Sequence, residues 1–176
     1  MDLEQLKIDL NFMMEALKEA QAAFDEDEVP IGCVIVGEEG EIIARAHNLT
    51  QLLKDPTAHA EMQAITAATS SLNAKYLTEC TLYVTVEPCP MCASALNWGQ
   101  IKRVVYGCKD LKRGASLYSK IQELNSKEKD VNLKEKDSHK TLYHPKTEVI
   151  GGVLKEECAN IIQDFFKKKR VEKCIE

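Results

Sequence analysis

The stretch TLYVTVEPCPMCASALNW, residues 81–98, decides the fold of this chain. Its first part, 81–87, consists mainly of β-branched, aromatic and aliphatic residues, a composition typical of a buried β-strand. The strand runs into Pro88, and a proline suits the start of a helix, which we expect to continue to about Trp98. A buried strand followed at once by a helix indicates an α/β fold.

Cys89 and Cys92 fall in the first turns of this expected helix. Residues three positions apart share a helix face, and the positive end of the helix dipole lowers the pKa of a nearby thiol. The spacing therefore allows both sulfurs to face one metal ion as thiolates.

A second stretch, TAHAEMQA at residues 57–64, supplies His59 and Glu61 just after the helix-start signal Asp55-Pro56-Thr57. Residues two positions apart point to nearly opposite sides of a regular helix. His59 and Glu61 can therefore serve one site only near a helix start. Together the two stretches predict a metal ion between two helix N-termini.

His59, Cys89 and Cys92 form a ligand set that suits zinc, because Zn²⁺ prefers imidazole and thiolate in tetrahedral geometry and two thiolates offset its charge. Three protein ligands leave a fourth position for water, whereas a structural zinc site is closed by four. Bound zinc lowers the pKa of that water to about 7. The pattern predicts a hydrolytic site with one Zn²⁺ per chain, in which Glu61 carries a proton and is not needed as a ligand.

The pair CPMC also has two other interpretations, a thioredoxin-like redox pair or half of a zinc ribbon. A ribbon needs a second close pair, but the other cysteines are scattered singly along the chain. A redox pair would leave His59 and Glu61 without a role. A catalytic metal site is therefore favoured. The scattered cysteines are Cys33, Cys80, Cys108, Cys158 and Cys174.

Outward from residues 81–98, the hydrophobic pattern predicts alternating helices and strands. An apolar stripe at helical spacing predicts a first helix near the N-terminus, and a turn at 37–40 joins two strands into a hairpin. The helix that carries Glu61 extends to about Ser70, and a last helix carries Phe165. This order implies a three-layer α/β/α fold around a central mixed sheet of about five strands. The other predicted strands are 31–36, 41–47, 103–107 and 147–154, and the stripe is Leu3, Leu6, Leu10, Met13, Leu17 and Ala20.

Composition frames the chain as one compact unit. With 176 residues, of which 44% are hydrophobic, it can bury one core, so we expect a single domain over residues 1–176. The N-terminal residues lack the basic flank and apolar core of a secretory signal, and no apolar stretch is long enough to span a bilayer. We expect a cytoplasmic protein without membrane contact. The odd count of 7 cysteines favours reduced thiols over a disulfide framework.

The two motifs resemble the zinc-dependent nucleobase deaminases, whose signature is His-x-Glu followed by Pro-Cys-x-x-Cys. Over nearly its whole length the chain is similar to the bacterial tRNA adenosine deaminases of that superfamily, which have a cytidine-deaminase-like fold. The matching segments are VPIGCVIV at 29–36, Asn48, DPTAHAEMQAI at 55–65, CTLYVTVEPCPMC at 80–92, RVVYGCKD at 103–110 and GGVLKEECANIIQDFFKKKR at 151–170.

The resemblance implies hydrolysis of adenosine to inosine at the wobble position of a tRNA anticodon loop. Zinc on His59, Cys89 and Cys92 would activate a water for attack on C6 of adenine, and Glu61 would move protons to N1 and to the departing amine. It also implies a homodimer. The substrate-binding residues that it implies are Asn48, Val29, Pro30, Ala60, Asp110 and Phe166.

The residues alone leave a structural interpretation open for most of these contacts. His47, next to Asn48, is expected to pair with a ligand or a backbone carbonyl rather than with the metal. The structural alternatives are a turn-forming residue for Asn48, strand entry for Val29 and Pro30, a surface acid for Asp110, and core packing for one of Phe165 and Phe166.

The net charge of −5 gives no general affinity for RNA, so any docking surface must be local. Lys109, Lys112 and Arg113 are candidates, whereas the basic run 167–170 also fits a solvated helix end. The segment 119–142 is rich in Lys, Glu and Asp and longer than the usual connection in the family, which predicts a charged surface insert.

Two other functions stay open at this stage. The run PCPMC followed by Trp98 resembles the guanine deaminases, and an acidic chain suits a small neutral substrate. A free-base deaminase acting on guanine or cytosine is therefore one alternative. A non-catalytic subunit that binds RNA or a partner is another. Glu61 argues against the second alternative, because a module without activity has no use for a proton carrier.

Overall fold

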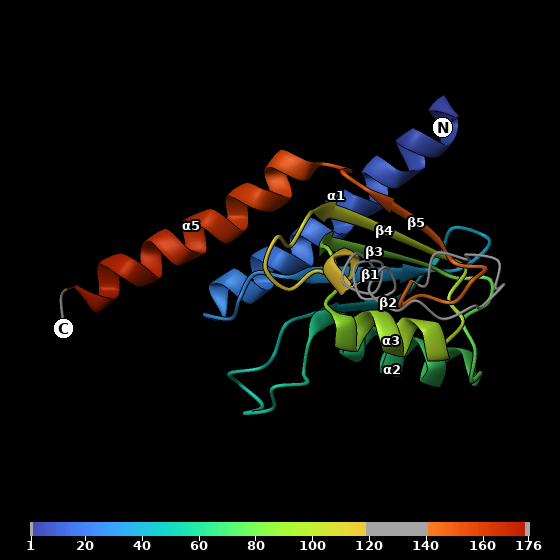
Figure 1. Cartoon of the computed structure of the whole chain (residues 1–176), viewed down its shortest axis with the longest axis horizontal. Helices are drawn as coiled ribbons and strands as arrows, with labels where there is room; N and C mark the ends of the chain where they lie inside the picture. The colour runs from blue at the N-terminus through green and yellow to red at the C-terminus, as the bar shows by residue number, and fades with distance from the viewer. Residues whose placement is uncertain (1, 119–140, 175–176) are drawn as a thin grey trace, which may run out of the picture.

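The computed structural model describes residues 2–118 and 141–174, and these form a five-stranded mixed sheet between two layers of helices (Figure 1). The strand order is β2-β1-β3-β4-β5. The three-layer α/β/α prediction is confirmed. The strands are β1 (Gly32–Val36), β2 (Ile42–His47), β3 (Thr81–Val86), β4 (Arg103–Cys108) and β5 (Glu148–Gly151).

The sheet combines antiparallel and parallel pairs. β1 is antiparallel to both β2 and β3, whereas β4 is parallel to β3 and β5 is parallel to β4. The carboxyl ends of β3 and β4 therefore lie at the same edge of the sheet. The segments that follow these two strands, 87–92 and 109–116, meet at that edge, which is where ligands bind in open α/β sheets.

Helices α1 (Leu3–Asp25) and α5 (Lys155–Lys173) cover one face of the sheet, and α2 (Ala60–Leu72) and α3 (Pro90–Trp98) cover the other (Figure 1). Each face buries its own hydrophobic cluster. Among the described helices, none has both the length and the apolar composition needed to span a membrane.

The apolar stripe predicted for α1 is only partly buried. Leu3 is 76% exposed, and the α1 residues that contact the sheet include Ala16 and Ala20. A side chain on Gly32 of β1 would collide with the backbone of Ala16 and Ala20. The helix therefore approaches the strand nearly backbone to backbone, and small residues replace the large ones that the stripe suggested.

A buried ion pair joins α1 to the sheet. Arg103 donates two hydrogen bonds to the carboxylate of Asp9, at 2.6 and 2.8 Å, and Asp9 is 0% exposed. Tyr83 on β3 donates to the same carboxylate at 3.0 Å. Burial opposes ionisation, but the bonds from Arg103, Gln5 and Tyr83 together hold the pKa of Asp9 below its usual value.

The observed boundaries differ from the predicted ones by a few residues. α3 begins at Pro90 with Cys89 as its N-cap, not at Pro88, and β5 covers 148–151, not 147–154. β5 is short because Gly152, at φ +100°, turns the chain away from the sheet. The predicted insert lies outside the described residues except for its end, where Leu142 accepts a hydrogen bond from Asn97 at 3.0 Å.

Candidate active site

His59 and Glu61 enter the site from the start of α2. His59 is the N-cap of that helix, and Glu61 lies in its first turn with only 3% of its surface exposed. The preceding turn is fixed by Asp55, whose side chain accepts a hydrogen bond from the Thr57 backbone N–H at 2.8 Å. The prediction that both residues lie near a helix start is confirmed.

Cys89 and Cys92 come from the start of α3, where Cys89 is the N-cap and Cys92 is buried. The His59 Nδ1 atom lies 3.7 Å from Cys89 Sγ and 3.5 Å from Cys92 Sγ, and the two sulfurs are 3.6 Å apart. Two helix N-termini thus bring one imidazole and two thiols into a single group.

These distances fit a tetrahedral zinc ion. With Zn–S bonds of about 2.3 Å and Zn–N bonds of about 2.0 to 2.1 Å, tetrahedral angles place two sulfurs about 3.8 Å apart and a sulfur and nitrogen about 3.5 Å apart. The three measured distances lie close to these values. Within the described residues the group holds His59, Cys89 and Cys92, and Glu61 is not one of its donors.

The electrostatic environment favours a thiolate beside the imidazole. A hydrogen bond with Cys92 is the main cause that lowers the pKa of Cys89 to about 4, and the same bond, with burial, raises the pKa of Cys92. A hydrogen bond with Cys89 raises the pKa of His59. A thiolate sulfur and an imidazole nitrogen this close together are the donors that Zn²⁺ prefers.

Burial raises the pKa of Glu61 to about 7, and the charge of Cys89 adds to this effect. The Glu61 Oε2 atom is buried and has no hydrogen-bond partner in the described part of the chain. A carboxyl group in this state can take up and release a proton near neutral pH. One of its oxygens is also available to a bound molecule.

The residues expected at the substrate fall into two groups. Asn48 is 4% exposed, its N–H donates to the Ile31 carbonyl at 3.0 Å, and the next residue, Leu49, bonds to Ala58 beside His59. Ala60 is fully buried between His59 and Glu61. Ala60 adjoins the ligand His59 in sequence, and Asn48 is linked to it through Leu49 and Ala58, whereas Val29 and Pro30 precede Ile31, the partner of Asn48.

Asp110 and Phe166 lie farther out. The Asp110 carboxylate accepts hydrogen bonds from the backbone N–H groups of Lys112 and Arg113 at 2.8 and 3.0 Å, so it closes a surface turn. Phe166 is 44% exposed on α5, and its ring lies edge-on to Phe165, the buried member of the pair. One phenylalanine in the core agrees with the prediction. Substrate contact by either residue stays a prediction.

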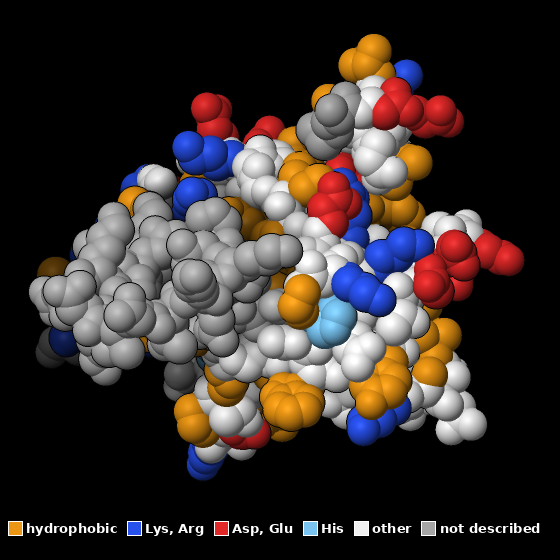
Figure 2. All heavy atoms as spheres, turned by 45° about the vertical axis from the view of Figure 1, so that its right-hand side comes forward, with side chains coloured by type: hydrophobic (Ala, Val, Ile, Leu, Met, Phe, Trp, Pro, Cys, Tyr) orange, Lys and Arg blue, Asp and Glu red, His pale blue; other side chains and the backbone are white. Residues whose placement is uncertain are grey.

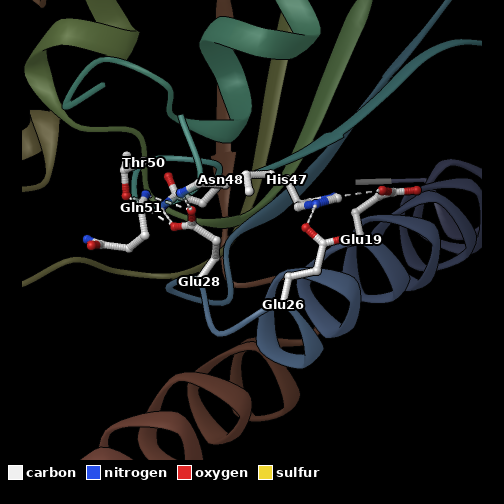
Figure 3. A network of polar contacts seen from close by, with 8 residues as sticks. Glu19, Glu26, Glu28, His47, Asn48, Thr50 and Gln51 are labelled. Atoms are coloured by element: carbon white, nitrogen blue, oxygen red, sulfur yellow. Dashed lines mark hydrogen bonds and ion pairs between the residues drawn. The ribbon is translucent and has the colours of Figure 1, made fainter. Parts of the chain in front are cut away.

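Sequence reasoning missed Glu28, a fully buried carboxylate that holds the loop after β2. Its Oε1 atom accepts from the backbone N–H groups of Gln51 and Leu52 at 2.6 and 2.8 Å, and its Oε2 atom accepts from the Thr50 hydroxyl at 3.2 Å (Figure 3). The Asn48 amide donates to Thr50 at 3.1 Å. Glu28 therefore fixes the loop that carries Asn48. An acid directly before the strand-entry pair was the only signal in the sequence.

His47 belongs to a separate polar cluster. Its ring nitrogens lie 3.4 Å from an oxygen of Glu19 on α1 and 3.2 Å from an oxygen of Glu26, the C-cap of that helix (Figure 3). Among the described residues its partners are these two carboxylates rather than the backbone carbonyl that we expected, and the alternative of pairing with a ligand stays a prediction. A surface hollow of ≈ 270 Å³ beside it shares no lining residue with the metal-ligand group.

Residues 8–170 match the family model described as MafB19-like deaminase. The tRNA-specific adenosine deaminase of Aquifex aeolicus is 43% identical over 163 residues, 90% of this chain and 94% of that protein. A structure from work on A-to-I editing by tRNA:A34 deaminases at the wobble position of transfer RNA matches with a TM-score of 0.69 and 38% identity, over 86% of this chain and 98% of that one.

A guanine deaminase from Bacillus subtilis is a more distant match, with a TM-score of 0.54 and 32% identity over 78% of this chain and 82% of that one. Both its identity and its structural similarity are lower than those of the tRNA:A34 deaminase. Since the family model covers most of the chain, and the similarity to the Aquifex protein extends over nearly all of both sequences, the chain belongs to the MafB19-like deaminases and, among them, to the tRNA-specific adenosine deaminase family.

Proposed function

We propose that this deaminase hydrolyses adenosine to inosine at the wobble position of a tRNA anticodon loop. The observation that carries the proposal is the group of three donors at tetrahedral spacing, with the buried carboxylate of Glu61 beside it, whose Oε2 atom has no partner in the described chain. A hydrolytic deaminase needs both, and members of the family carry the name of this substrate.

His59, Cys89 and Cys92 would hold one Zn²⁺ per chain. Bound there, zinc supplies Lewis acidity that lowers the pKa of a water to about 7. The fold supplies the rest. Two helix starts hold the three side chains together, and burial of Cys92 at 0% exposure keeps bulk solvent from one side of the group.

Glu61 is the proton carrier in the proposed reaction. It accepts a proton from the attacking water while the water oxygen forms a bond to C6 of adenine, and it delivers that proton to N1. Glu61 then carries the second proton from the new C6 hydroxyl to the exocyclic amine, the C6–N6 bond breaks, and ammonia leaves as C6 becomes a carbonyl. The net change consumes one water and releases one ammonia.

Asn48, Val29, Pro30 and Ala60 are proposed to form the base pocket. The support is that Ala60 follows His59, that Asn48 bonds to Ile31 after the pair Val29 and Pro30, and that Glu28 holds the Asn48 loop. An adenosine in a single-stranded loop can be splayed into such a pocket at low cost, because it has no base pair to break.

RNA docking would rest on a local basic surface. On the face drawn in Figure 2, basic and acidic side chains are interspersed among scattered hydrophobic ones wherever the described residues are visible. Lys109, Lys112 and Arg113 are exposed next to Asp110 at the carboxyl end of β4 and are the proposed phosphate contacts. The role proposed for Asp110 and Phe166 is to line the mouth of the site.

We also propose a cytoplasmic homodimer of single-domain chains. Trp98 at the end of α3 is 82% exposed, and such a large apolar side chain is one that a second copy of the chain could cover. Sedimentation of the full chain and of Trp98→Glu tests this, because a dimer through α3 should dissociate in the variant.

The decisive experiment supplies zinc-loaded protein with an anticodon stem-loop bearing adenosine at the wobble position, and in parallel with free guanine and free cytosine. Inosine in the stem-loop is the expected product. Ammonia from guanine alone would establish the free-base alternative. The match to the Bacillus guanine deaminase is the reason to include that alternative in the test. Metal analysis of Cys89→Ser tests the ligand set, since loss of one thiolate should lower zinc content.

A further inference from the structure

Glu87, between β3 and Pro88, has a buried carboxylate that the proposed reaction does not use. The residue is 5% exposed, and no Lys or Arg of the described chain forms an ion pair with it. Its Oε1 atom accepts from the Ser116 backbone N–H at 2.9 Å, and its Oε2 atom accepts from that of Asp110 at 3.3 Å. Since a buried charge without a cation is costly, these bonds point to a role in holding the backbone that makes them.

The backbone held in this way is the 109–116 loop, which follows β4. The loop is attached to residues 87–88 at both ends, because the Glu87 N–H donates to the Cys108 carbonyl at 2.8 Å and the Ala115 N–H donates to the Pro88 carbonyl at 2.9 Å. Pro88 directly precedes the metal-ligand candidate Cys89. The carboxylate of Glu87 thus completes a clamp between this loop and the start of α3.

Gly114 lets the loop lie directly on the carboxylate. A Cβ atom at this position would lie 2.5 Å from Glu87 Oε2 and 2.6 Å from the Asp110 carbonyl oxygen, too close for any side chain. Between these contacts, Asp110 closes the turn through the N–H groups of Lys112 and Arg113. The loop is therefore rigid where it carries exposed basic residues.

Arg113 is an exposed basic residue of this loop, directly before the clamped Gly114. Two positions further on, the Ala115 N–H donates to the carbonyl of Pro88, the residue before Cys89. The backbone at Arg113 therefore lies beside the start of α3. The side chain of Arg113 is exposed, and no ion pair joins it to another described side chain.

We propose that Glu87 is a positioning residue that clamps the 109–116 loop so that Arg113 binds a phosphate of the RNA beside the target nucleotide. This rests on the proposed function in assuming an RNA substrate. It adds a reason why RNA is bound in preference to a free base, because a base has no phosphate for Arg113 to contact.

The test measures binding separately from turnover. In the Glu61→Ala background, the affinity of the full chain for the wobble-adenosine stem-loop is followed by fluorescence anisotropy over a series of salt concentrations. Arg113→Ala should weaken binding about threefold to tenfold at low salt and reduce the salt slope by about 0.7, the value for one contact to a single strand. Glu87→Gln should weaken binding in the same way, and the double variant should be no weaker than Arg113→Ala alone.

Gly114→Ala provides a second route to the same state, because it pushes the loop away while the carboxylate remains. It should reproduce the loss of affinity even if Glu87→Gln folds poorly. The matched control is Lys102→Ala, which removes an exposed cation at the opposite end of β4 and should leave the affinity within about twofold, since it contacts no phosphate. Hydrogen exchange reports the clamp directly, and the amides of Asp110 and Ser116 should exchange faster in Glu87→Gln.

Two results would overturn the proposal. Unchanged affinity in Glu87→Gln and Gly114→Ala, with the parent binding RNA, removes the positioning role. Failure of the parent to bind the stem-loop removes the phosphate contact, whereas the exchange rates still decide whether the clamp exists. If RNA binds through Arg113 but no inosine forms, the proposed function fails and this inference stands.

Discussion

Asp9 and Glu61 are both buried carboxylates, but they lie on opposite faces of the sheet in opposite environments. Asp9 receives two hydrogen bonds from Arg103 and one from Tyr83, and its pKa is lowered. Glu61 has no such cation, one of its oxygens has no partner in the described chain, and its pKa is raised to about 7. The comparison shows that the partner and not the burial decides whether an inner acid holds the fold or stays free for chemistry.

The strongest test of this comparison is Glu61→Ala. Because Glu61 is the proposed acid–base group at the metal ligands, we expect turnover to fall by about 10²-fold to 10⁴-fold, the usual contribution of such a group. Zinc content and the thermal unfolding midpoint should stay near those of the parent. Initial rates on the stem-loop and metal analysis check this, and a fully active variant would falsify the proton-carrier role.

The counterpart on the other face is Arg103→Met, which leaves Asp9 buried without its cation. Breaking a buried pair from one side costs about 3 to 5 kcal/mol. Urea unfolding should show a loss of that size, while zinc content of the folded protein is unchanged. A loss below about 1 kcal/mol would mean that Asp9 finds other partners and that the pair does not stabilise the fold.

Acid titration sharpens the comparison further. The folded pKa of Asp9 is below its usual value of 3.8, so the unfolded chain binds more protons than the folded one in that range. The stabilisation by Asp9 is full above the unfolded pKa and is lost as the pH falls through the folded pKa. Unfolding free energies measured between pH 5 and pH 2 should therefore fall more steeply in the parent than in Asp9→Asn. Parallel curves would contradict this.

The smallest effect is expected next to Arg103. Lys102 forms an exposed ion pair with Glu79 at 2.8 Å, and its side chain is 53% exposed. Solvent and salt screen an exposed pair, so Lys102→Ala should leave the unfolding free energy almost unchanged. Removing the buried cation Arg103 would then lower the unfolding free energy several times more than removing the exposed cation Lys102. An equal loss in both variants would undo the distinction.

The metal-ligand group could be predicted because its signal is local. Cys89 and Cys92 are three positions apart on one helix start, and His59 and Glu61 share another, so the spacing within each pair already limits the geometry. The strand 81–87 and its helix were likewise evident from composition, with errors of one or two residues at their ends. The family resemblance supplied the link between the two pairs.

The three other buried acids could not be predicted, because their partners are remote in the sequence. Asp9 and Arg103 are 94 residues apart, and Glu87 and Ser116 are 29 apart. Such contacts have no period that a pattern can detect. The alanine-rich face of α1 was missed for a related reason, since it depends on how closely the helix approaches Gly32. The contacts of Asn48, Asp110 and Phe166 with a substrate stay predictions.

The missing side chain at Gly32 has a mechanical consequence for the distant mouth of the site. It sets the spacing between α1 and the sheet, and the end of α1 leads within a few residues to Glu28, whose N–H bonds to the Ala23 carbonyl at 2.8 Å. A methyl group at position 32 would push α1 away from the sheet. The end of the helix would then shift Glu28 and the loop to which Glu28 is hydrogen-bonded. The distance between α1 and the sheet therefore affects the position of the loop at the candidate active site.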